Sequence, residues 1–323
     1  MLTGLLRSNT IVSFLLAYLI SASMLMFQFF FGQPKGGPND LLFTHWAFGW
    51  LESNSTVISV SCLVLALGAL IFGRLRFREV KTTLAEPNVG MVAMASIICT
   101  QAKPLFTRPD VLITAVILIG LFMLIFSTYK RDSVLSEMFH VGLLLGFAAL
   151  FVGQSILLVL SVGFSMLILR TGNWKEWFVF LLGIAMTVVF AALFLVWNES
   201  PFLAFQRMIQ TSWVGSLTTE RFTLGHLLQV FLVVVSFSSI LRDLTAGTVH
   251  ERNISLVNVG WVMGVLLMVL ALGLGWQVGF ILAAFPLSTF ISRSVDSINR
   301  WWFADLMLIL LIAAPFLSSL WQL

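Results

Sequence analysis

Three short polar segments hold most of the side chains in this sequence that could do chemistry. The segments are 32–55, 103–110 and 198–225. Their candidate site residues are Asp40, His45, Arg108, Arg207 and Arg221. A positioned carboxylate can act as a general base, and arginines bind phosphate through charge-assisted hydrogen bonds. We therefore expect Asp40 to be a catalytic base, with the other four residues around an anionic, phosphate-bearing substrate.

The same residues also have a simpler interpretation. Charged side chains in short loops solvate the loop, cap helices and set the orientation of a membrane protein. His45 would then be a packing residue at the membrane interface. The sequence leaves both interpretations open.

Three further polar residues stand in or beside apolar runs. They are His140, Gln154 and Asp305. An ionisable residue inside lipid is costly and marks a functional site by default. For Asp305 we expect an ion pair with Arg300 or Arg293 near the inner interface, and for the other two we expect hydrogen bonds between helices. A single buried acid argues against an ion-coupled transporter.

Several motifs that would name a reaction are missing from the sequence. It contains no Gly-rich phosphate loop, no His-Glu-x-x-His, no nucleophile elbow and no cysteine pair. An ATPase, a metalloprotease and a serine hydrolase are therefore not expected. The two cysteines, Cys62 and Cys99, stand alone in apolar runs, so neither a disulfide nor a metal site is predicted, and no cofactor is expected.

Composition predicts the class of fold. Of 323 residues, 59% are hydrophobic and only 10% are charged, whereas a typical soluble domain is about 25% charged. A soluble fold could not hide so much apolar surface, but a lipid bilayer removes that difficulty. The basic residues lie in short loops and form no patch interleaved with aromatics, so no nucleic-acid partner is expected. We predict an all-α, polytopic transmembrane helical bundle that forms one integral membrane domain over 1–323.

About eleven apolar runs are long enough, or nearly so, to cross a bilayer. The runs are 11–31, 56–73, 89–102, 111–128, 139–153, 155–170, 178–197, 225–241, 254–272, 276–291 and 301–320. The run 89–102 is short and contains Ser96 and Thr100. The runs 139–153 and 155–170 are separated only by Gln154, which fits either a tight helical hairpin or one long broken element. These short pieces could also be re-entrant.

The positive-inside rule tests this map independently of hydrophobicity. With a cytoplasmic N-terminus, the inside loops hold Arg7, Arg74, Arg76, Arg78, Lys81, Lys130, Arg131, Arg170, Lys175, Arg242, Arg252, Arg293 and Arg300. The outside loops hold Lys35, Lys103, Arg108, Arg207 and Arg221. This bias supports eleven spans with the C-terminus outside. Merging 139–170 into one span would reverse every later loop, which favours the hairpin.

Two apolar stretches within the outside loops are too short to span. They lie at 41–51 and 201–212, and both are expected to be interfacial helices. Within the predicted spans, three glycine pairs have the spacing of close helix contacts. These pairs are Gly142/Gly146, Gly260/Gly264 and Gly275/Gly279.

Residues from Arg74 to about Gly183 resemble an uncharacterised multi-pass family of bacterial inner-membrane proteins. The resemblance rests on Arg74-Leu75-Arg76, Pro104, Tyr129-Lys130-Arg131, Ser136-Glu137-Met138-Phe139, Gly146-Phe147-Ala148-Ala149-Leu150-Phe151 and Asn173-Trp174-Lys175-Glu176-Trp177. It covers about a third of the chain. It implies a bacterial inner (cytoplasmic) membrane location and brings no activity with it.

More distantly, the chain is similar to membrane glycosyltransferases that use polyprenyl-phosphate sugars. Asp40 in the first outer loop, followed by the stretch 41–51, matches their outline of an outer acidic residue with interfacial helices. The chain departs from them because it has no paired-acid motif and no large terminal soluble domain. This similarity implies a polyprenyl-phosphate-linked sugar as substrate.

Three functions follow as competing expectations. The first is an enzyme or handler of lipid-linked saccharides at the outer leaflet. The second is a non-catalytic membrane scaffold or assembly subunit that binds other membrane proteins. The third is a transporter or flippase, ranked last because the sequence shows few mid-span charges and no clear pair of broken helices.

Overall fold

In the computed structural model, the described residues are 2–7, 11–31, 55–79, 87–101, 105–106, 108–129, 131, 134–170, 173–198, 223–298 and 301–320. The principal helices of this part of the chain are α1 (Leu2–Arg7), α2 (Ile11–Phe31), α4 (Ser55–Glu79), α5 (Pro87–Thr100), α7 (Pro109–Ser127), α8 (Leu135–Phe151), η2 (Gly153–Leu157), α9 (Leu158–Leu169), α10 (Trp174–Asn198), α12 (Leu224–Ala246), α13 (Val249–Leu272), α14 (Trp276–Leu282), α15 (Ala284–Ser297) and α16 (Trp301–Leu320). The predicted interfacial helices at 41–51 and 201–212 lie outside the described residues.

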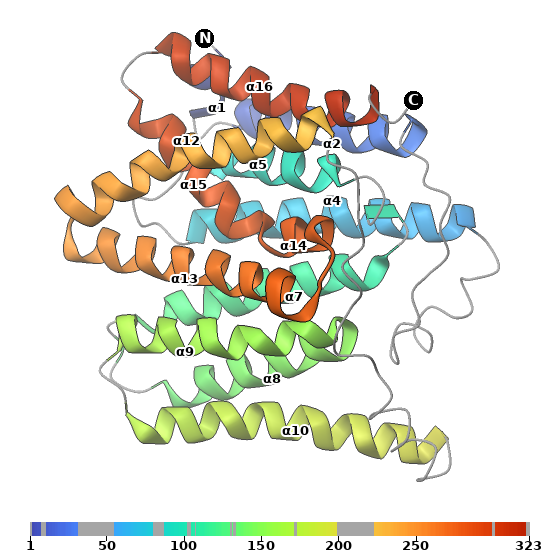
Figure 1. The fold of residues 1–323 in the computed structure, drawn as a ribbon, viewed down its shortest axis with the longest axis vertical. Helices are drawn as coiled ribbons and strands as arrows, with labels where there is room; N and C mark the ends of the chain where they lie inside the picture. Colours follow the sequence, from blue (N-terminus) through green and yellow to red (C-terminus); the bar gives the residue numbers. More distant parts are fainter. Residues whose placement is uncertain are drawn as a thin grey trace.

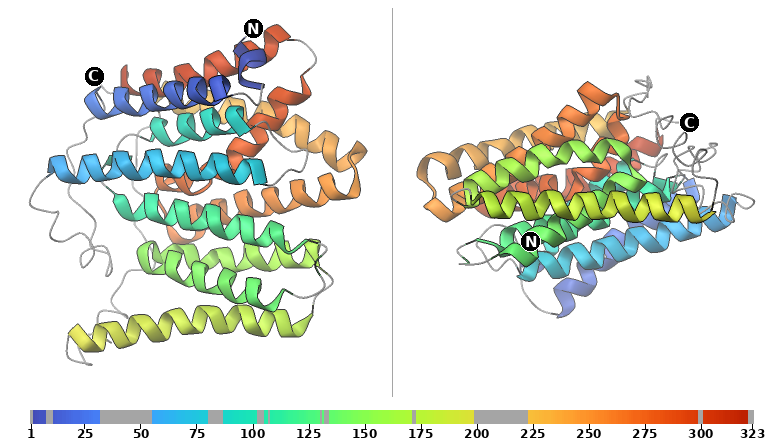
Figure 2. Two further views of the ribbon diagram at one scale, coloured as in Figure 1. Left: turned by 180° about the vertical axis from the view of Figure 1, so that it is seen from behind. Right: turned by 90° about the horizontal axis from the view of Figure 1, so that it is seen from below.

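The long helices lie side by side in one elongated bundle, with successive elements running in alternating directions (Figures 1 and 2). Helices α2 and α16 lie at one edge and α10 at the other. Every predicted apolar run coincides with a helix or with a helix pair. The all-α class of fold is therefore confirmed for the described part of the chain.

Length and composition support fewer crossings than the eleven expected. Among the described residues, seven helices are long and apolar enough to cross a membrane, or up to eight if the bent pair α14–α15 counts as one span. The shorter apolar helices are α5, α8 and the unit formed by η2 and α9. The protein thus has the architecture of a multi-pass helical membrane protein, whose lipid-facing surface carries the apolar side chains that the composition anticipates.

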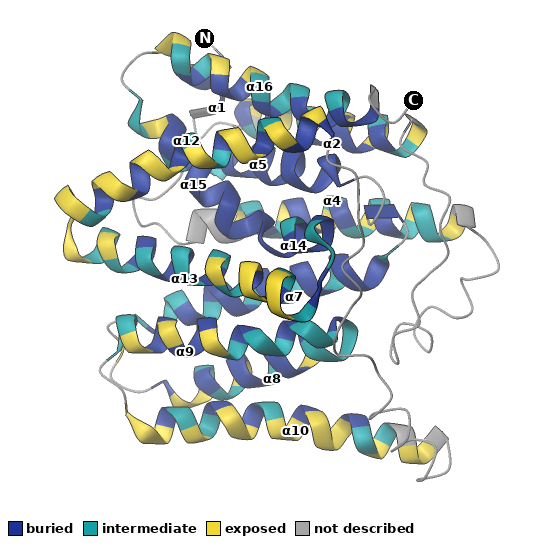
Figure 3. Ribbon diagram, in the orientation of Figure 1, coloured by how far each residue is buried: buried dark blue, intermediate teal, exposed yellow. Residues whose placement is uncertain are grey.

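Helix α10 shows how the bundle meets lipid. Its described side chains are mostly exposed and apolar, and the two tryptophans near its ends, Trp174 and Trp197, are 71% and 90% exposed (Figure 3). Its 25 residues extend about 37 Å, enough to cross a hydrocarbon core of about 30 Å. Tryptophan at both ends of a lipid-facing helix is typical of interfacial anchoring.

Helix α5 is the opposite case, because all but its first residue are buried (Figure 3). It contacts α2, α4, α15 and α16. Its 14 residues reach only about 21 Å, less than the thickness of the hydrocarbon core. The sequence allows this position because the helix carries no charge and is rich in small residues, which let neighbouring helices approach closely.

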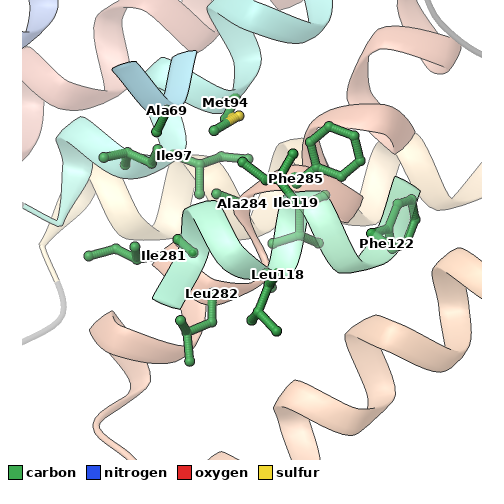
Figure 4. Packing of buried hydrophobic residues seen from close by; sticks show 14 of the residues in the cluster. Ala69, Met94, Ile97, Leu118, Ile119, Phe122, Ile281, Leu282, Ala284 and Phe285 are labelled. Carbon is green, nitrogen blue, oxygen red and sulfur yellow. The ribbon is translucent and has the colours of Figure 1, made fainter. Parts of the chain in front are cut away.

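The predicted run 276–291 is not one straight helix. It consists of α14 and α15, which meet at Ala283 with a bend of 65° and continue to Ser297. The chain enters this pair through Gly273, whose φ of 65° ends α13 in the left-handed region that glycine adopts without strain. Phe122 and Phe285 lie beside the break (Figure 4). The ring of Phe122 packs edge-on against Phe285 and Trp261, at centroid distances of 5.2 and 5.5 Å.

The run 139–170 forms a helical hairpin, as the charge bias favoured. Helices α8 and α9 are joined by the short helix η2, and α8 contacts both α7 and α10. The α8–α10 contact is close because a Cβ atom on Gly142 would overlap the carbonyl oxygen of Phe180, and one on Gly183 would overlap that of Phe139. The prediction of a close contact at Gly142 and Gly146 is therefore confirmed.

Candidate functional site

Helix α12 carries a polar face that is buried along almost its whole length. The residues are His226, Gln229, Ser236, Ser239 and Asp243, with exposed fractions between 0% and 5%. Their spacing follows the helical period, so they lie on one side of α12. That side faces α5, α15 and α16. We call these five residues the α12 seam.

The end of the seam near the start of α12 is a network of neutral hydrogen bonds. The backbone N–H of Thr223 donates to Nδ1 of His226 at 3.1 Å, so the ring proton resides on Nε2. His226 Nε2 then donates to Oε1 of Gln101 at 3.1 Å. The edge of the Trp276 ring packs against the imidazole at 4.3 Å between centroids. A neutral imidazole is thereby fixed in one tautomer between α5, α12 and α14.

Gln229 extends this network into α5. Its Nε2 donates to the hydroxyl of Thr100 at 2.6 Å and to the carbonyl of Ser96 at 2.8 Å. Its Oε1 accepts a longer bond from Gln101 Nε2 at 3.4 Å. Gln229 and its three partners are each at most 1% exposed. These polar groups have no water to bond inside a membrane, so they bond to one another.

A proline explains how α16 joins the same region. Pro315 lies inside α16 and has no N–H, so the carbonyl of Leu311 lacks its helical donor. The hydroxyl of Ser96 donates to that carbonyl. On the other side, Gln28 of α2 donates to the carbonyl of Pro315 and reaches the hydroxyl of Ser318 at 3.4 Å. The carbonyl freed by the proline is thus satisfied by α5, and α2 bonds to the next turn of the same helix.

The middle of the seam is less completely bonded. Ser239 donates to the backbone carbonyl of Ser236 at 2.7 Å, within its own helix. The hydroxyl of Ser236 is buried and, among the described residues, has no hydrogen-bond partner. The Oε1 atom of Gln277 in α14 is in the same situation. Each of these two buried atoms is therefore available to a polar ligand.

The opposite end of the seam is charged. Nε of Arg293 in α15 forms an ion pair with Oδ2 of Asp243, and its Nη2 lies 3.7 Å from Oε1 of Glu251 in α13. Ser255 donates to Asp243 at 3.4 Å, and Glu251 accepts the N–H of Thr248 at 2.8 Å as part of a capping box. The cluster ties α12, α13 and α15 together.

Four of the residues predicted to form a site lie outside the described residues. They are Asp40, His45, Arg207 and Arg221. Arg108 is described, and its Nη2 forms an ion pair with Oδ2 of Asp110 at 2.8 Å at the start of α7. Its Nε is buried without a partner among the described atoms.

The expected partners of Asp305 are not the ones observed. Its Oδ1 accepts the backbone N–H and the hydroxyl of Thr3, both at 2.8 Å, while Arg293 binds Asp243 and Glu251. Arg300 lies outside the described residues. The reason is tertiary, because α1 packs against α16 and presents its free first-turn amides to the carboxylate.

The other two predicted polar residues do not join the seam. His140 is exposed, and its Nδ1 contacts the carbonyl of Ser136 in its own helix at 2.6 Å rather than a neighbouring helix. Gln154 lies in η2 with a half-buried side chain. Cys62 and Cys99 are buried and free.

The α12 seam was not predicted, although its polar residues have a recognisable spacing in the sequence. Five polar residues recur at helical spacing through the run 225–241 and just beyond it. The predicted run ended at residue 241, two residues before Asp243, whereas α12 continues to Ala246. A count of polar residues on each helical face would have detected the pattern.

The described residues contain no group of three or more His, Cys, Asp or Glu side chains that could hold a metal ion. A comparison of the chain with models of protein families, with curated proteins and with solved structures finds no match. The α12 seam is therefore interpreted from its own chemistry.

Proposed function

We propose that the chain crosses a bacterial inner membrane eleven times, with its N-terminus in the cytoplasm and its C-terminus outside. Two observations support this topology: the alternating direction of successive elements, and the location of basic residues (Figure 1). The described basic residues near one end of the bundle are Arg74, Arg131, Arg170, Lys175, Arg242, Arg252 and Arg293. Arg108 lies at the opposite end, and such a bias marks the cytoplasmic side.

Within this topology, the protein carries a small polar solute across the membrane along the α12 seam. The observation that carries this proposal is the buried polar face that extends from His226 to Asp243. Polar groups inside a membrane are costly, and they commonly line substrate pathways. The sequence argued against a transporter because it showed a single buried acid and no broken helices. In the structure, Asp243 is a buried acid within a long apolar helix, and α14–α15 is a broken pair that contacts α12.

The chemistry of the seam favours an uncharged solute with hydroxyl or amide groups. Its outer part presents amides, hydroxyls and a neutral imidazole, all of which hydrogen-bond without compensating a charge. At the inner end, the charges of Asp243 and Arg293 are paired with each other. Every seam residue is at most 5% exposed, so transport along the seam requires the helices around it to move apart.

The test is uptake of a radiolabelled polyol series, from glycerol to a hexitol, into proteoliposomes. We expect faster uptake than in protein-free vesicles for at least one polyol, and loss of that uptake in Ser236→Leu. Ser238→Leu is the matched control, because Ser238 lies on the exposed face of the same helix and bonds only within it. Equal uptake with and without protein across the series would overturn the proposal.

A second candidate is a handler of lipid-linked saccharides at the outer leaflet. It is favoured by Arg108, whose buried Nε retains a free donor suited to a phosphate at the outer end of α7. Asp40 would be the base in this function. The measurement is a mass-spectrometric profile of lipid-linked sugars in wild-type, deletion and Asp40→Asn cells. Accumulation of one precursor in both mutants supports this candidate, and unchanged profiles reject it.

A further inference from the structure

Helix α15 is enclosed by protein although it belongs to an apolar bundle. All residues from Ala284 to Ser292 are buried, and α15 packs against α12 and α5, so it covers part of the seam (Figure 3). Its own polar residues include Ser288, which is fully buried and bonds to the carbonyl of Phe285 in the same helix. The hydroxyls of Ser288 and Thr289 bond to carbonyls of α15 itself, so these two side chains do not tie α15 to the seam.

One end of α15 is a break that has the properties of a hinge. The bend of 65° occurs at Ala283, although the N–H of Ala283 still donates to Gly279 at 2.9 Å and its carbonyl accepts from Leu287 at 3.0 Å. Pro286 has no N–H, so the carbonyl of Leu282 lacks its helical donor and the ladder is weakened at the break. The side chains that surround the break, including Phe122, Leu118 and Met94, are apolar and line a small cavity there (Figure 4). Apolar contacts of this kind do not specify one orientation as strictly as hydrogen bonds do.

The other end of α15 is held by charge. Arg293 lies two turns beyond Pro286 and pairs with Asp243 of α12 and, at 3.7 Å, with Glu251 of α13. Its side chain is 12% exposed, so the pair with Asp243 is largely shielded from water. A shielded pair has defined geometry, and loss of one partner would leave an uncompensated buried charge.

We infer that α15 is the inner gate of the α12 seam, with its hinge at Ala283 and its latch at Arg293. When the latch is released, the inner end of α15 moves away from α12 and exposes the seam to the cytoplasmic side. Gates that turn about a helix break and are closed by a few contacts are a common form of conformational switch. This inference rests on the proposed transport function, because it assigns α15 a role in opening the transport path.

The experiment measures the labelling rate of Ser239→Cys by a charged, membrane-impermeant thiol reagent in inverted membrane vesicles. Ser239 lies one turn from Asp243 on the buried face, and the background lacks the native thiols through Cys62→Ala and Cys99→Ala. The latch is removed by Asp243→Asn together with Arg293→Gln. This pair of changes leaves neither of the two charges buried alone, so the variant is expected to fold.

We expect the labelling rate of Ser239→Cys to rise about tenfold in the latch-free variant and to stay at the wild-type value in Arg293→Lys, which retains the cation. Thr245→Cys, which is exposed at the inner end of α12, should label equally in both and reports vesicle orientation. Ser238→Cys on the lipid-facing side should not respond to the latch.

An unchanged rate at Ser239→Cys, in a variant that is monodisperse in detergent and labels normally at Thr245→Cys, would overturn the gate. This outcome is separate from the uptake test. If a polyol is transported while the latch-free variant labels like wild type, the seam transports but α15 is not its gate. If labelling rises while no polyol enters, α15 moves but the transport proposal fails.

Discussion

At the scale of single residues, one chain of buried hydrogen bonds begins where Pro315 interrupts the backbone bonding of α16. Pro315 frees the carbonyl of Leu311, Ser96 occupies that carbonyl, and the backbone of Ser96 in turn accepts a bond from Gln229. Each bond depends on a helix from a distant part of the sequence. The network therefore couples α5, α12 and α16 at one depth in the membrane.

Gln229 is the residue on which this network depends most. In Gln229→Leu, the hydroxyl of Thr100 and the amide of Gln101 lose a partner in a buried environment, which should destabilise the fold by about 1–3 kcal/mol. Thermal challenge in detergent followed by size-exclusion chromatography measures the loss. Ser238→Ala on the same helix is the control and should change stability little, because Ser238 is exposed. Equal losses in the two variants would argue against a cooperative network.

At the scale of elements, close helix contacts depend on individual glycines. Among the described helices, α10 makes its most extensive contact with α8, and there Gly142 and Gly183 allow the two backbones to touch. Glycine is otherwise a poor helix residue. Its presence at these two positions is explained by the approach of the backbones, whereas at Gly68 of α4 an added Cβ atom would meet nothing within 4 Å.

This difference predicts opposite outcomes for one and the same substitution. Gly142→Ala should destabilise the protein by about 1–3 kcal/mol, because the added methyl group overlaps the carbonyl of Phe180. Gly68→Ala should leave stability unchanged or raise it by up to about 1 kcal/mol, since alanine is the better helix former. Unfolding temperature in detergent is the measurement. A tolerated Gly142→Ala would mean that the backbones of α8 and α10 do not touch at this position.

At the scale of the whole molecule, the hairpin α8–α9 determines the orientation of every later helix. If 139–170 crossed the membrane once, the ends of the protein would lie on the same side. The structure instead turns the chain back at η2, with Gln154 at the turn. The hairpin leaves Arg131 and Asn173 at the same end of the bundle, where Arg170 donates to the carbonyl of Arg131 at 2.7 Å.

Single cysteines test this arrangement directly. In the Cys62→Ala, Cys99→Ala background, Arg131→Cys and Asn173→Cys should react with an impermeant reagent from the same side of the membrane, because both residues are exposed. Gln154→Cys should react only from the opposite side. Labelling of Arg131→Cys and Asn173→Cys from opposite sides would exclude the hairpin crossing and, with it, the eleven-span topology.

Much of the architecture could be predicted from the sequence because lipid imposes local rules. A run of apolar residues must form a helix, since its backbone groups have no water to bond, and basic loops mark one side. Thus the run 11–31 coincides with α2, and the pair Gly142/Gly146 predicted a close contact. The predicted site stays a prediction, since Asp40, His45, Arg207 and Arg221 lie outside the described residues, whereas the polar seam inside α12 was not predicted.

Composition and the spacing of residues along the chain determine the class of fold and the positions of the helices. They also show that common catalytic motifs are absent from the sequence, so these three features could be predicted without a structure. Which side chains meet depends instead on tertiary packing. Arg293 pairs with Asp243 and Glu251, and Asp305 binds Thr3, because hydrogen bonds and ion pairs form between whichever helices adjoin. At Ala283, Pro286 gives a local reason for a helix break, whereas the angle of 65° is set where α14 packs against α5, α7 and α13.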